Sequence, residues 1–209
     1  MTLDPKKRDV LISKSLSYLL RHGAEKEKLN INNQGYIPIP DILNHQKLKS
    51  FKTTKEDLFR IVEENDKKRF TIDLRNQLIC ANQGHSLAVV NNENLIKLSK
   101  EELLKLNIYH GTYKKKISLI KSSGGLKKMN RNHIHFTCDE YQSISGIRKT
   151  ANVLIYLNIE KCLDQGFEFY KSLNNVILSS GDSNGIIQWE FISKIVDLNN
   201  GSELDLDAI

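Results

Sequence analysis

The chain has 209 residues, of which 39% are hydrophobic and 27% are charged, with only 11 glycines and 3 prolines. This composition is typical of a globular protein of one or two domains and excludes a collagen-like, low-complexity or wholly disordered chain. No apolar run is long enough to cross a bilayer, no apolar leader follows Met1, and the three scattered cysteines predict neither disulfides nor a zinc site. We expect an intracellular protein of the cytoplasm or the nucleus, without membrane contact.

The net charge of +6 is distributed unevenly along the chain. Residues 110–150 carry nine Lys/Arg against two Asp/Glu, a net charge of +7, whereas residues 151–209 carry three against nine, a net charge of −6. A concentrated basic segment favours an anionic partner, most often nucleic acid or a nucleotide. From charge alone, a solvated basic face without a partner is an equal alternative.

The spacing of apolar residues predicts several helices and one hairpin in the first part of the chain. In chain order these are a helix over 8–22 ended by Gly23, an extended piece over 35–40, a short helix over 41–48 capped by Asp41, an amphipathic helix over 57–66 with a capping signal at Thr53 and Thr54, and a hairpin of 68–72 with 77–81. The prolines of the extended piece keep it out of the centre of a sheet. Helices followed by a hairpin indicate a winged-helix arrangement, which holds nucleic acid in some proteins and is purely structural in others.

A connector with one short helix, over residues 86–108, leads to a second part that is rich in strands. Its predicted elements are a strand over 108–112, a helix over 115–122 closed by Gly124 and Gly125, a strand over 133–137, a helix over 141–150, and strands over 152–159, 175–179 and 190–196. Neither an internal repeat nor a Walker or Rossmann phosphate loop is present. We therefore predict an α+β fold with a first lobe over 1–92, a connector over 93–106 and a second lobe over 107–209.

Three sites in the first lobe could hold an anion, and each has a structural alternative. Arg21 and His22 stand at the end of the first helix, where the helix dipole also favours a simple cation pair. Arg69 belongs to the basic run KKR at the hairpin, which could equally be a solvated surface. The sequence NQGHS at 82–86 could bring backbone N–H groups to a phosphate, or it could form a plain turn.

The most informative stretch of the second lobe is RNHIHFT, at residues 131–137. Strand alternation would place four polar side chains on one face: Arg131, His133, His135 and Thr137. Polar groups inside an apolar lobe need partners. A metal pair is one interpretation of His-x-His, but no carboxylate or cysteine stands nearby, so an anion or nucleotide pocket fits better. Gly111, in the sequence HGT at 110–112, would let a ligand approach the backbone.

Taken together, eight short motifs resemble the RNA 2′-phosphotransferase family, and the fungal members most closely. They are LSYLLRH (16–22), QGY (34–36), RIVEENDKKRF (60–70), NQGHS (82–86), HGT (110–112), MNRNHIHF (129–136), SGIRK (145–149) and SLNNVILSS (172–180). The resemblance covers nearly the whole chain. It implies a winged-helix-like RNA lobe at 1–92 and an NAD-binding lobe of ADP-ribosyltransferase fold at 107–209.

The resemblance also implies the last step of tRNA splicing, with NAD consumed as a co-substrate and without a metal. The splice-junction 2′-phosphate attacks C1″ of the nicotinamide ribose and expels nicotinamide. O2″ of that ribose then attacks the phosphorus, which gives RNA with a 2′-OH and ADP-ribose 1″,2″-cyclic phosphate. The family's essential residues correspond to Arg21, His22, Arg69 and Arg131.

Further residues follow from the same resemblance. The NAD side comprises His110, Gly111, Thr112, His135 and Thr137, and additional contacts to RNA or phosphate come from Gly84, His85, Ser86, Arg148 and Lys149. Val176 or Ile177 stands where protein-modifying relatives carry a catalytic Glu, which argues against protein ADP-ribosylation. We expect Trp189 to pack in the core, and we expect a monomer without an obligate protein partner.

Two other functions remain as alternatives at this stage. An inactive winged-helix RNA-binding protein would keep the basic surface but would have no reason to keep both the HGT sequence and the strand of His135. An enzyme that stops after adding ADP-ribose to a terminal phosphate would not need the complete set of arginines and histidine.

Overall fold

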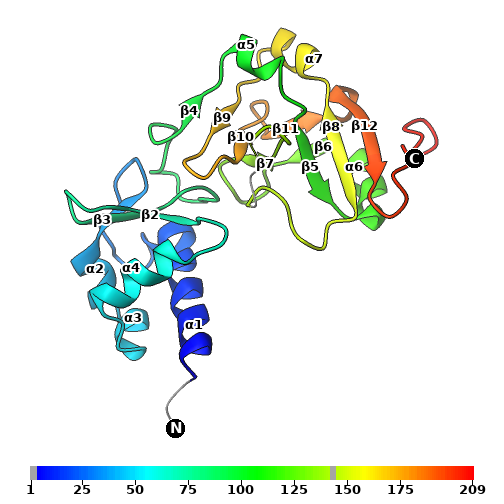
Figure 1. Ribbon diagram of the computed structural model, residues 1–209. Helices are drawn as coiled ribbons and strands as arrows, with labels where there is room; N and C mark the ends of the chain where they lie inside the picture. Colours follow the sequence, from blue (N-terminus) through cyan, green and yellow to red (C-terminus); the bar gives the residue numbers. More distant parts are fainter. Residues whose placement is uncertain (1–3, 142–144) are drawn as a thin grey trace. The chain divides into compact units, whose positions relative to one another are not determined.

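The computed structural model describes residues 4–141 and 145–209, and the chain divides into two compact units after Asn94 (Figure 1). Each unit has its own hydrophobic core and contains both helices and strands. The expected α+β composition is therefore confirmed.

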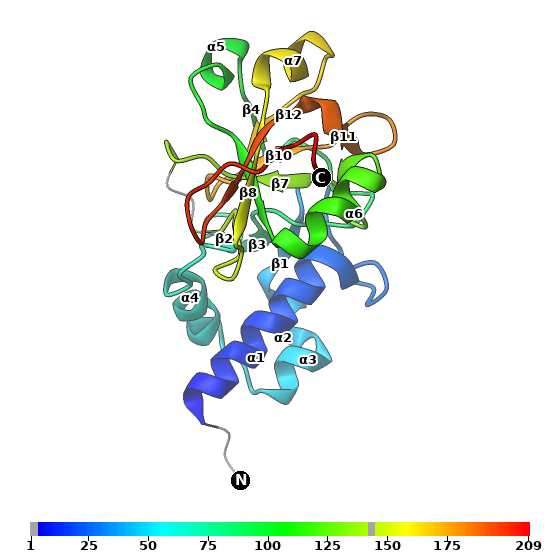
Figure 2. The ribbon, with the colours of Figure 1, turned by 90° about the vertical axis from the view of Figure 1, so that its right-hand side faces the viewer.

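The first unit consists of helices and one small antiparallel sheet. Its elements are α1 (Pro5–Tyr18), the π-helix η1 (Leu19–Gly23), β1 (Tyr36–Pro38), α2 (Ile39–Asn44), α3 (Gln46–Ser50), α4 (Lys55–Glu63), β2 (Phe70–Asp73) and β3 (Leu78–Ala81). The strand order is β1-β3-β2, so the predicted hairpin is confirmed and the proline-containing strand lies at an edge, where it disturbs the sheet least. Figure 2 shows α1 between α4 on one side and α2 with α3 on the other.

Side-chain hydrogen bonds fix the position of α4 against α1. Thr54 caps α4 in a reciprocal capping box with Asp57, as its sequence predicts. Asp57 also accepts two hydrogen bonds from Arg8 of α1, at 3.1 and 2.6 Å, and Arg60 of α4 donates to Asp9 at 2.6 and 2.9 Å. These contacts join the two helices at one end of the unit, while their apolar faces form the core.

The first helix ends at Gly23, as predicted, although this glycine is not in a left-handed conformation; a Cβ there would lie 2.5 Å from the Tyr18 ring, so the glycine makes room for that ring. Two other predictions for this unit were wrong in detail. The extended piece ends at Pro38, because α2 begins at Ile39 and carries Pro40 in its first turn, where a missing N–H costs nothing. Asp41 consequently lies inside the first turn and does not cap the helix.

The second unit is built from short strands with small helices at their ends. Its elements are β4 (Ile96–Lys97), α5 (Lys100–Leu103), β5 (Tyr109–Thr112), the 3₁₀ turn η2 (Lys114–Lys116), α6 (Ile117–Ser122), β6 (Gly125–Lys127), β7 (Ile134–Phe136), β8 (Val153–Leu157), α7 (Ile159–Asp164), β9 (Tyr170–Lys171), β10 (Ile177–Ser179), β11 (Ile186–Gln188), the 3₁₀ turn η3 (Trp189–Phe191) and β12 (Ile192–Asp197). The sheets have the orders β4-β9-β10-β7, β12-β8-β5 and β11-β6. In both ribbon views α5 and α7 lie near each other at one end of this unit (Figures 1 and 2).

The two larger sheets of this unit meet at β5 and β7. Tyr109 and Thr137 exchange two backbone hydrogen bonds of 2.9 Å, which join the start of one strand to the end of the other. One core cluster contains inward-facing residues of both sheets, including Phe136 and Ile155, which are fully buried. This junction brings the HGT sequence next to the strand of His135.

Two predictions for this unit were wrong. The described residues of the predicted helix over 141–150, residue 141 and residues 145–150, are turns and bends; residues 142–144 lie outside the described part. Arg131 lies in a bend before β7, so strand alternation does not place it on the face of His135.

Candidate active site

The π-helix η1 carries both Arg21 and His22. A π-helix has a wider backbone spiral than an α-helix and is found frequently at functional sites. The segment 82–86 runs back to this turn: the backbone N–H of Ser86 donates to the carbonyl of Arg21 at 2.9 Å. Nδ1 of His22 lies 2.9 Å from Oγ of Ser86. The motifs LSYLLRH and NQGHS, which lie far apart in the chain, are thus joined by one backbone hydrogen bond and one side-chain hydrogen bond.

Glycines allow this segment to pack closely. Gly84 has φ +88°, and a Cβ there would lie 3.5 Å from both Cδ and Nε of Arg21, so the arginine side chain rests against the glycine backbone. Gly35 of the QGY motif has φ +85°, and a Cβ on it would lie 2.9 Å from Nε2 of the buried His85. Left-handed backbone at both positions favours glycine. The QGY and NQGHS motifs therefore form one packed structure.

Arg69 is held by the other end of the same segment. The backbone N–H of Asn82 donates to the carbonyl of Arg69 at 2.8 Å, and the Asn82 side chain donates to the carbonyl of Lys68 at 2.6 Å. Asn65 accepts from the Arg69 backbone N–H at 3.2 Å. Residues 82–86 thus connect Arg69 at one end with Arg21 and His22 at the other. Asn82, the first residue of the NQGHS motif, holds the chain at Lys68 and Arg69.

In the second unit, His110 of β5 is fixed by the neighbouring strand. Its Nδ1 lies 2.8 Å from the carbonyl oxygen of His135, and a carbonyl only accepts, so Nδ1 carries the proton. Burial lowers the pKa of His110; the hydrogen bond to His135 opposes this shift, and the charge of Arg148 adds to it. The ring is neutral near pH 7, and its Nε2 is a hydrogen-bond acceptor.

The same arrangement recurs one step along β7. Nδ1 of His135 lies 3.1 Å from the carbonyl oxygen of His133 and is likewise the donor. Burial, with a smaller effect of Lys128, lowers the pKa of His133 to about 4. Thr112 and Thr137 are buried beside these strands, at 8% and 3% exposure. His110 and His133 are therefore neutral near pH 7, and the two threonines add uncharged hydrogen-bonding groups.

Residues 145–151 cover these strands. A Cβ on Gly111 would lie 2.0 Å from Cγ1 of Ile147, and a Cβ on Gly146 would lie 2.7 Å from Cβ of Thr137. The space over Gly111, which was predicted to admit a ligand, is thus filled by Ile147. Ile147 was missed as a site residue; only its place in the SGIRK motif could have indicated it.

Three basic side chains lie at the rim of this region. Partial burial lowers the pKa of Arg131, and the charge of Arg148 lowers it further. The charge of Arg148 lowers the pKa of His110 as well. Lys149 is exposed beside it.

The position of the missing carboxylate is apolar. Val176 and Ile177 are fully buried, and Ile177 pairs with Phe136 in the sheet. Trp189 packs against the core of the unit, as expected. Among residues 4–141 and 145–209, no group of three or more His, Cys, Asp or Glu side chains is arranged to hold a metal ion. No helix in the same ranges is long and apolar enough to cross a membrane.

The sequence matches the RNA 2′-phosphotransferase, Tpt1 / KptA family over residues 7–181. The tRNA 2′-phosphotransferase of Saccharomyces cerevisiae is 41% identical over 203 residues, which cover 93% of this chain and 86% of the yeast protein. The tRNA 2′-phosphotransferase 1 of Danio rerio is 40% identical over 189 residues, with 86% and 82% covered. A probable RNA 2′-phosphotransferase of Flavobacterium johnsoniae is 36% identical over 169 residues, with 80% and 89% covered.

These similarities are high and extend over most of each protein. The chain belongs to the RNA 2′-phosphotransferase, Tpt1 / KptA family, and the resemblance of its eight motifs is confirmed. The chain is thus a member of a family of phosphotransferases.

Proposed function

We propose that the protein is an NAD-dependent tRNA 2′-phosphotransferase that removes the splice-junction 2′-phosphate in the last step of tRNA splicing. The names of its relatives support an RNA substrate with a 2′-phosphate. The observation that carries the proposal is the segment 82–86, which connects Arg69 with Arg21 and His22. In this proposal the first unit is a winged-helix-like RNA lobe, which its helices and β2–β3 hairpin support, and the strand-rich second unit is an ADP-ribosyltransferase-like lobe.

The first unit is suited to the phosphate. A 2′-phosphate dianion beside an RNA backbone needs fixed positive charge, and guanidinium groups can bind it through two parallel hydrogen bonds. Arg21 and Arg69 supply this charge from opposite ends of one packed segment. His22 is oriented by Ser86, and a hydroxyl can either donate or accept, so the ring is able to hold or release a proton. We assign His22 to phosphate positioning and proton transfer.

The second unit is suited to the ribose and phosphates of NAD. Nε2 of His110 is a neutral acceptor that would take a hydrogen bond from a ribose hydroxyl. His135, Thr112 and Thr137 add polar groups along the same strands. Arg131 and Arg148 would offset the negative charge of the pyrophosphate and of the arriving phosphate.

The first step needs no general base for its nucleophile, and the proton transfers of the second step are assigned to His22. First, an ionised phosphate oxygen forms a bond to C1″ while the bond to nicotinamide breaks, and nicotinamide leaves with the electron pair. Then O2″ loses its proton and attacks the phosphorus, and the RNA 2′-oxygen leaves and takes up a proton. An ionised phosphate needs no carboxylate to activate it, which agrees with the apolar Val176 and Ile177. Arginines stabilise the extra charge of the second transition state.

The proposal includes the expected setting of the reaction. The substrate is a tRNA or another RNA with an internal 2′-phosphate, NAD is consumed, and no metal takes part. The protein acts as a monomer in the cytoplasm or the nucleus, and Gly84, His85, Ser86, Arg148 and Lys149 add contacts to RNA or phosphate.

The test is an incubation of the purified protein with a short RNA that carries one internal 2′-phosphate, with and without NAD, in the presence of EDTA. RNA is followed on gels and small products by mass spectrometry. We expect NAD-dependent loss of the phosphate with release of nicotinamide and ADP-ribose 1″,2″-cyclic phosphate. RNA that binds but stays unchanged would support a binding module instead, and RNA that gains ADP-ribose and goes no further would contradict the second step.

A further inference from the structure

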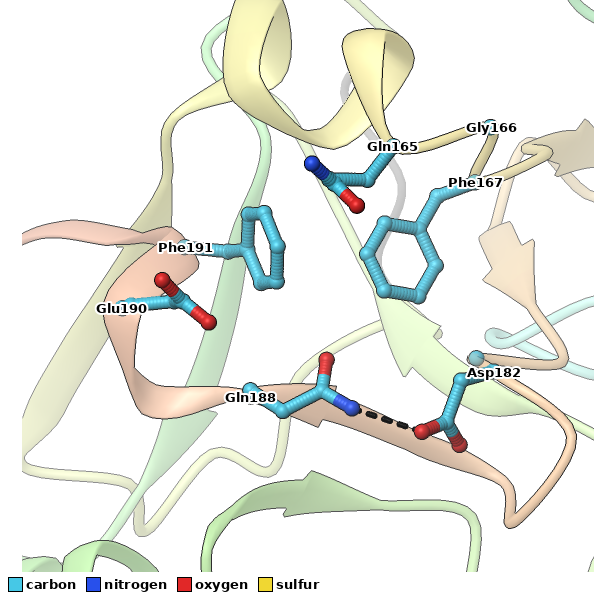
Figure 3. Close-up of a pocket in the computed structure, with 8 residues that line it drawn as sticks. Gln165, Gly166, Phe167, Asp182, Gln188, Glu190 and Phe191 are labelled. Carbon is cyan, nitrogen blue, oxygen red and sulfur yellow. Dashed lines mark hydrogen bonds between the residues drawn. The ribbon is translucent and has the colours of Figure 1, made fainter.

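A cavity of about 330 Å³ lies in the second unit, between the end of α7 and the 3₁₀ turn η3 (Figure 3). The side chains that matter for its chemistry are Gln165, Phe167, Asp182, Gln188, Glu190 and Phe191. None of them belongs to the candidate active site. All come from the acidic part of the chain, residues 151–209, which has nine Asp/Glu against three Lys/Arg.

Asp182 fixes the orientation of the Gln188 amide. Its Oδ1 accepts from the backbone N–H groups of Asn184 and Ile186, at 2.8 and 3.0 Å, and its Oδ2 lies 2.6 Å from Nε2 of Gln188. These hydrogen bonds, that of Ile186 first, lower the pKa of Asp182, so the group is ionised. A carboxylate cannot donate, so Gln188 must turn its NH₂ group to Asp182 and its carbonyl oxygen the other way. Figure 3 shows that oxygen pointing into the cavity.

Other acceptors lie around the same space. The oxygen of the Gln165 amide points into the cavity from the opposite side, and the Glu190 carboxylate lies between Phe191 and Gln188 (Figure 3). Glu190 is exposed, and its carboxylate has no hydrogen bond or ion pair with any residue that the structure describes. The cavity is therefore rich in acceptors, and one of them carries an unneutralised negative charge.

Aromatic rings form the wall behind these acceptors. Phe167 and Phe191 meet edge to face, with centroids 5.1 Å apart and an angle of 78° between the rings. A phenyl face attracts cations, and carbonyl and carboxylate oxygens need N–H donors. An anion or a nucleotide would be repelled by Asp182 and Glu190. Acceptor oxygens beside two phenyl rings favour a cation that has several N–H donors and an apolar chain.

We propose that this cavity binds a small organic cation that has a guanidinium or ammonium head on an alkyl chain. The head donates to the oxygens of Gln188, Gln165 and Glu190, and the methylene groups lie against Phe167 and Phe191. The inference is independent of the proposed transferase reaction, because none of the residues assigned to that reaction lines the cavity.

The experiment compares butylguanidinium with butylurea, which has almost the same shape but no charge. Dissociation constants for the full chain are measured by ligand-observed NMR at constant ionic strength. The fluorescence of Trp189, the single tryptophan of the chain, serves as a local second signal between Gln188 and Glu190. We expect saturable binding of butylguanidinium in the millimolar range or tighter and at least about fivefold weaker binding of butylurea, a difference typical of one charge contact. Equal binding of the two probes, or none by butylguanidinium, would overturn the proposal.

Two variants test the location of the site. Glu190→Gln keeps the shape of the side chain and removes its charge. It should weaken the binding of butylguanidinium about fivefold and leave the rate of 2′-phosphotransfer unchanged. Glu160→Gln makes the same charge change in the exposed first turn of α7, outside the cavity lining, and should leave binding within about 1.5-fold. An equal effect of both variants, or no effect of Glu190→Gln, would show that the cation binds elsewhere.

Discussion

His22 and His110 stand in different units and have different partners. His22 lies beside the hydroxyl of Ser86, which can donate or accept, and its side chain is exposed. His110 lies beside the carbonyl of His135, which only accepts, and burial lowers its pKa. The first arrangement permits a change of protonation, whereas the second keeps one tautomer. The partner atom, more than the residue type, decides whether a histidine can transfer a proton or serves as a fixed acceptor.

The charges around the two histidines also differ. In the first unit, cationic Arg21 and Arg69 are attached to the segment 82–86, which suits an anionic ligand. In the second unit, the strands carry the neutral His110 and two buried threonines, and Arg131 and Arg148 are exposed. This difference is why we propose that the first unit binds the phosphate and the second the nucleotide sugar.

The largest effect is expected at Arg69 and Arg131. Substitution of either by Ala removes a charge that stabilises the second transition state, and we expect kcat to fall by about 10²–10³. ADP-ribosylated RNA should accumulate, or turnover should stop altogether. Gels of the RNA and mass spectrometry of the products measure this. Normal product formation by both variants would contradict the assignment.

A smaller effect is expected at Arg21, for which Arg8 on the same continuous helix provides a matched control. Arg21→Ala should lower kcat/KM for RNA by about 10², because a charge-assisted contact to phosphate is lost. Arg8 donates instead to Asp57 and to the carbonyls of Phe51 and Lys52, so Arg8→Ala should cost about 1 kcal/mol of stability and leave kcat/KM unchanged. Steady-state kinetics and urea unfolding separate the two outcomes; a similar loss of activity in both variants would refute the role of Arg21.

A double variant can test whether residues 145–151 cover β5. Gly111→Ala places a Cβ 2.0 Å from Ile147, and we expect a loss of about 1–3 kcal/mol of stability and a higher KM for NAD. Ile147→Ala added to Gly111→Ala frees that space and should restore at least half of the loss. Thermal unfolding and NAD kinetics measure both effects. A double variant no better than Gly111→Ala would show that Ile147 is not the obstacle.

The buried His133 predicts a pH dependence of stability. Its pKa is about 4 in the folded chain, against a reference value of 6.5. Above pH 6.5 the imidazole is therefore neutral in both the folded and the unfolded chain, and it costs no stability there. Between pH 6.5 and 4 the unfolded chain takes up the proton first, and stability falls by about 3 kcal/mol. His133→Asn should flatten this part of the curve in urea unfolding. An unchanged slope would exclude His133 as its cause.

Much of the first unit could be predicted from the sequence, because its signals are local. The Thr54 capping signal precedes α4, and alternating residues form the β2–β3 hairpin. The π-helix could not be predicted, because the residues of η1 have ordinary helical spacing, and the hydrogen bond from Ser86 to the Arg21 carbonyl joins segments far apart in the chain. Sequence spacing likewise gives no indication that Gly23 accommodates the Tyr18 ring.

The second unit was harder to predict because several of its strands exist only through distant partners. β4 has two residues, and it forms by pairing with β9, about seventy residues later in the chain. Arg131 was placed on a strand because RNHIHFT alternates, but β7 begins at Ile134. The neighbourhood of His110 and His135 follows from the Tyr109–Thr137 bridge, which no local pattern announces.

The most direct test of the division between the units measures the binding of each substrate alone. NAD and 2′-phosphorylated RNA are titrated separately into the wild type, Arg21→Ala and His110→Ala. We predict that Arg21→Ala weakens the binding of RNA at least about tenfold and leaves the Kd of NAD within about twofold of the wild type. His110→Ala should weaken the binding of NAD to a similar degree and leave that of RNA unchanged. Weaker binding of the same substrate in both variants would contradict the account.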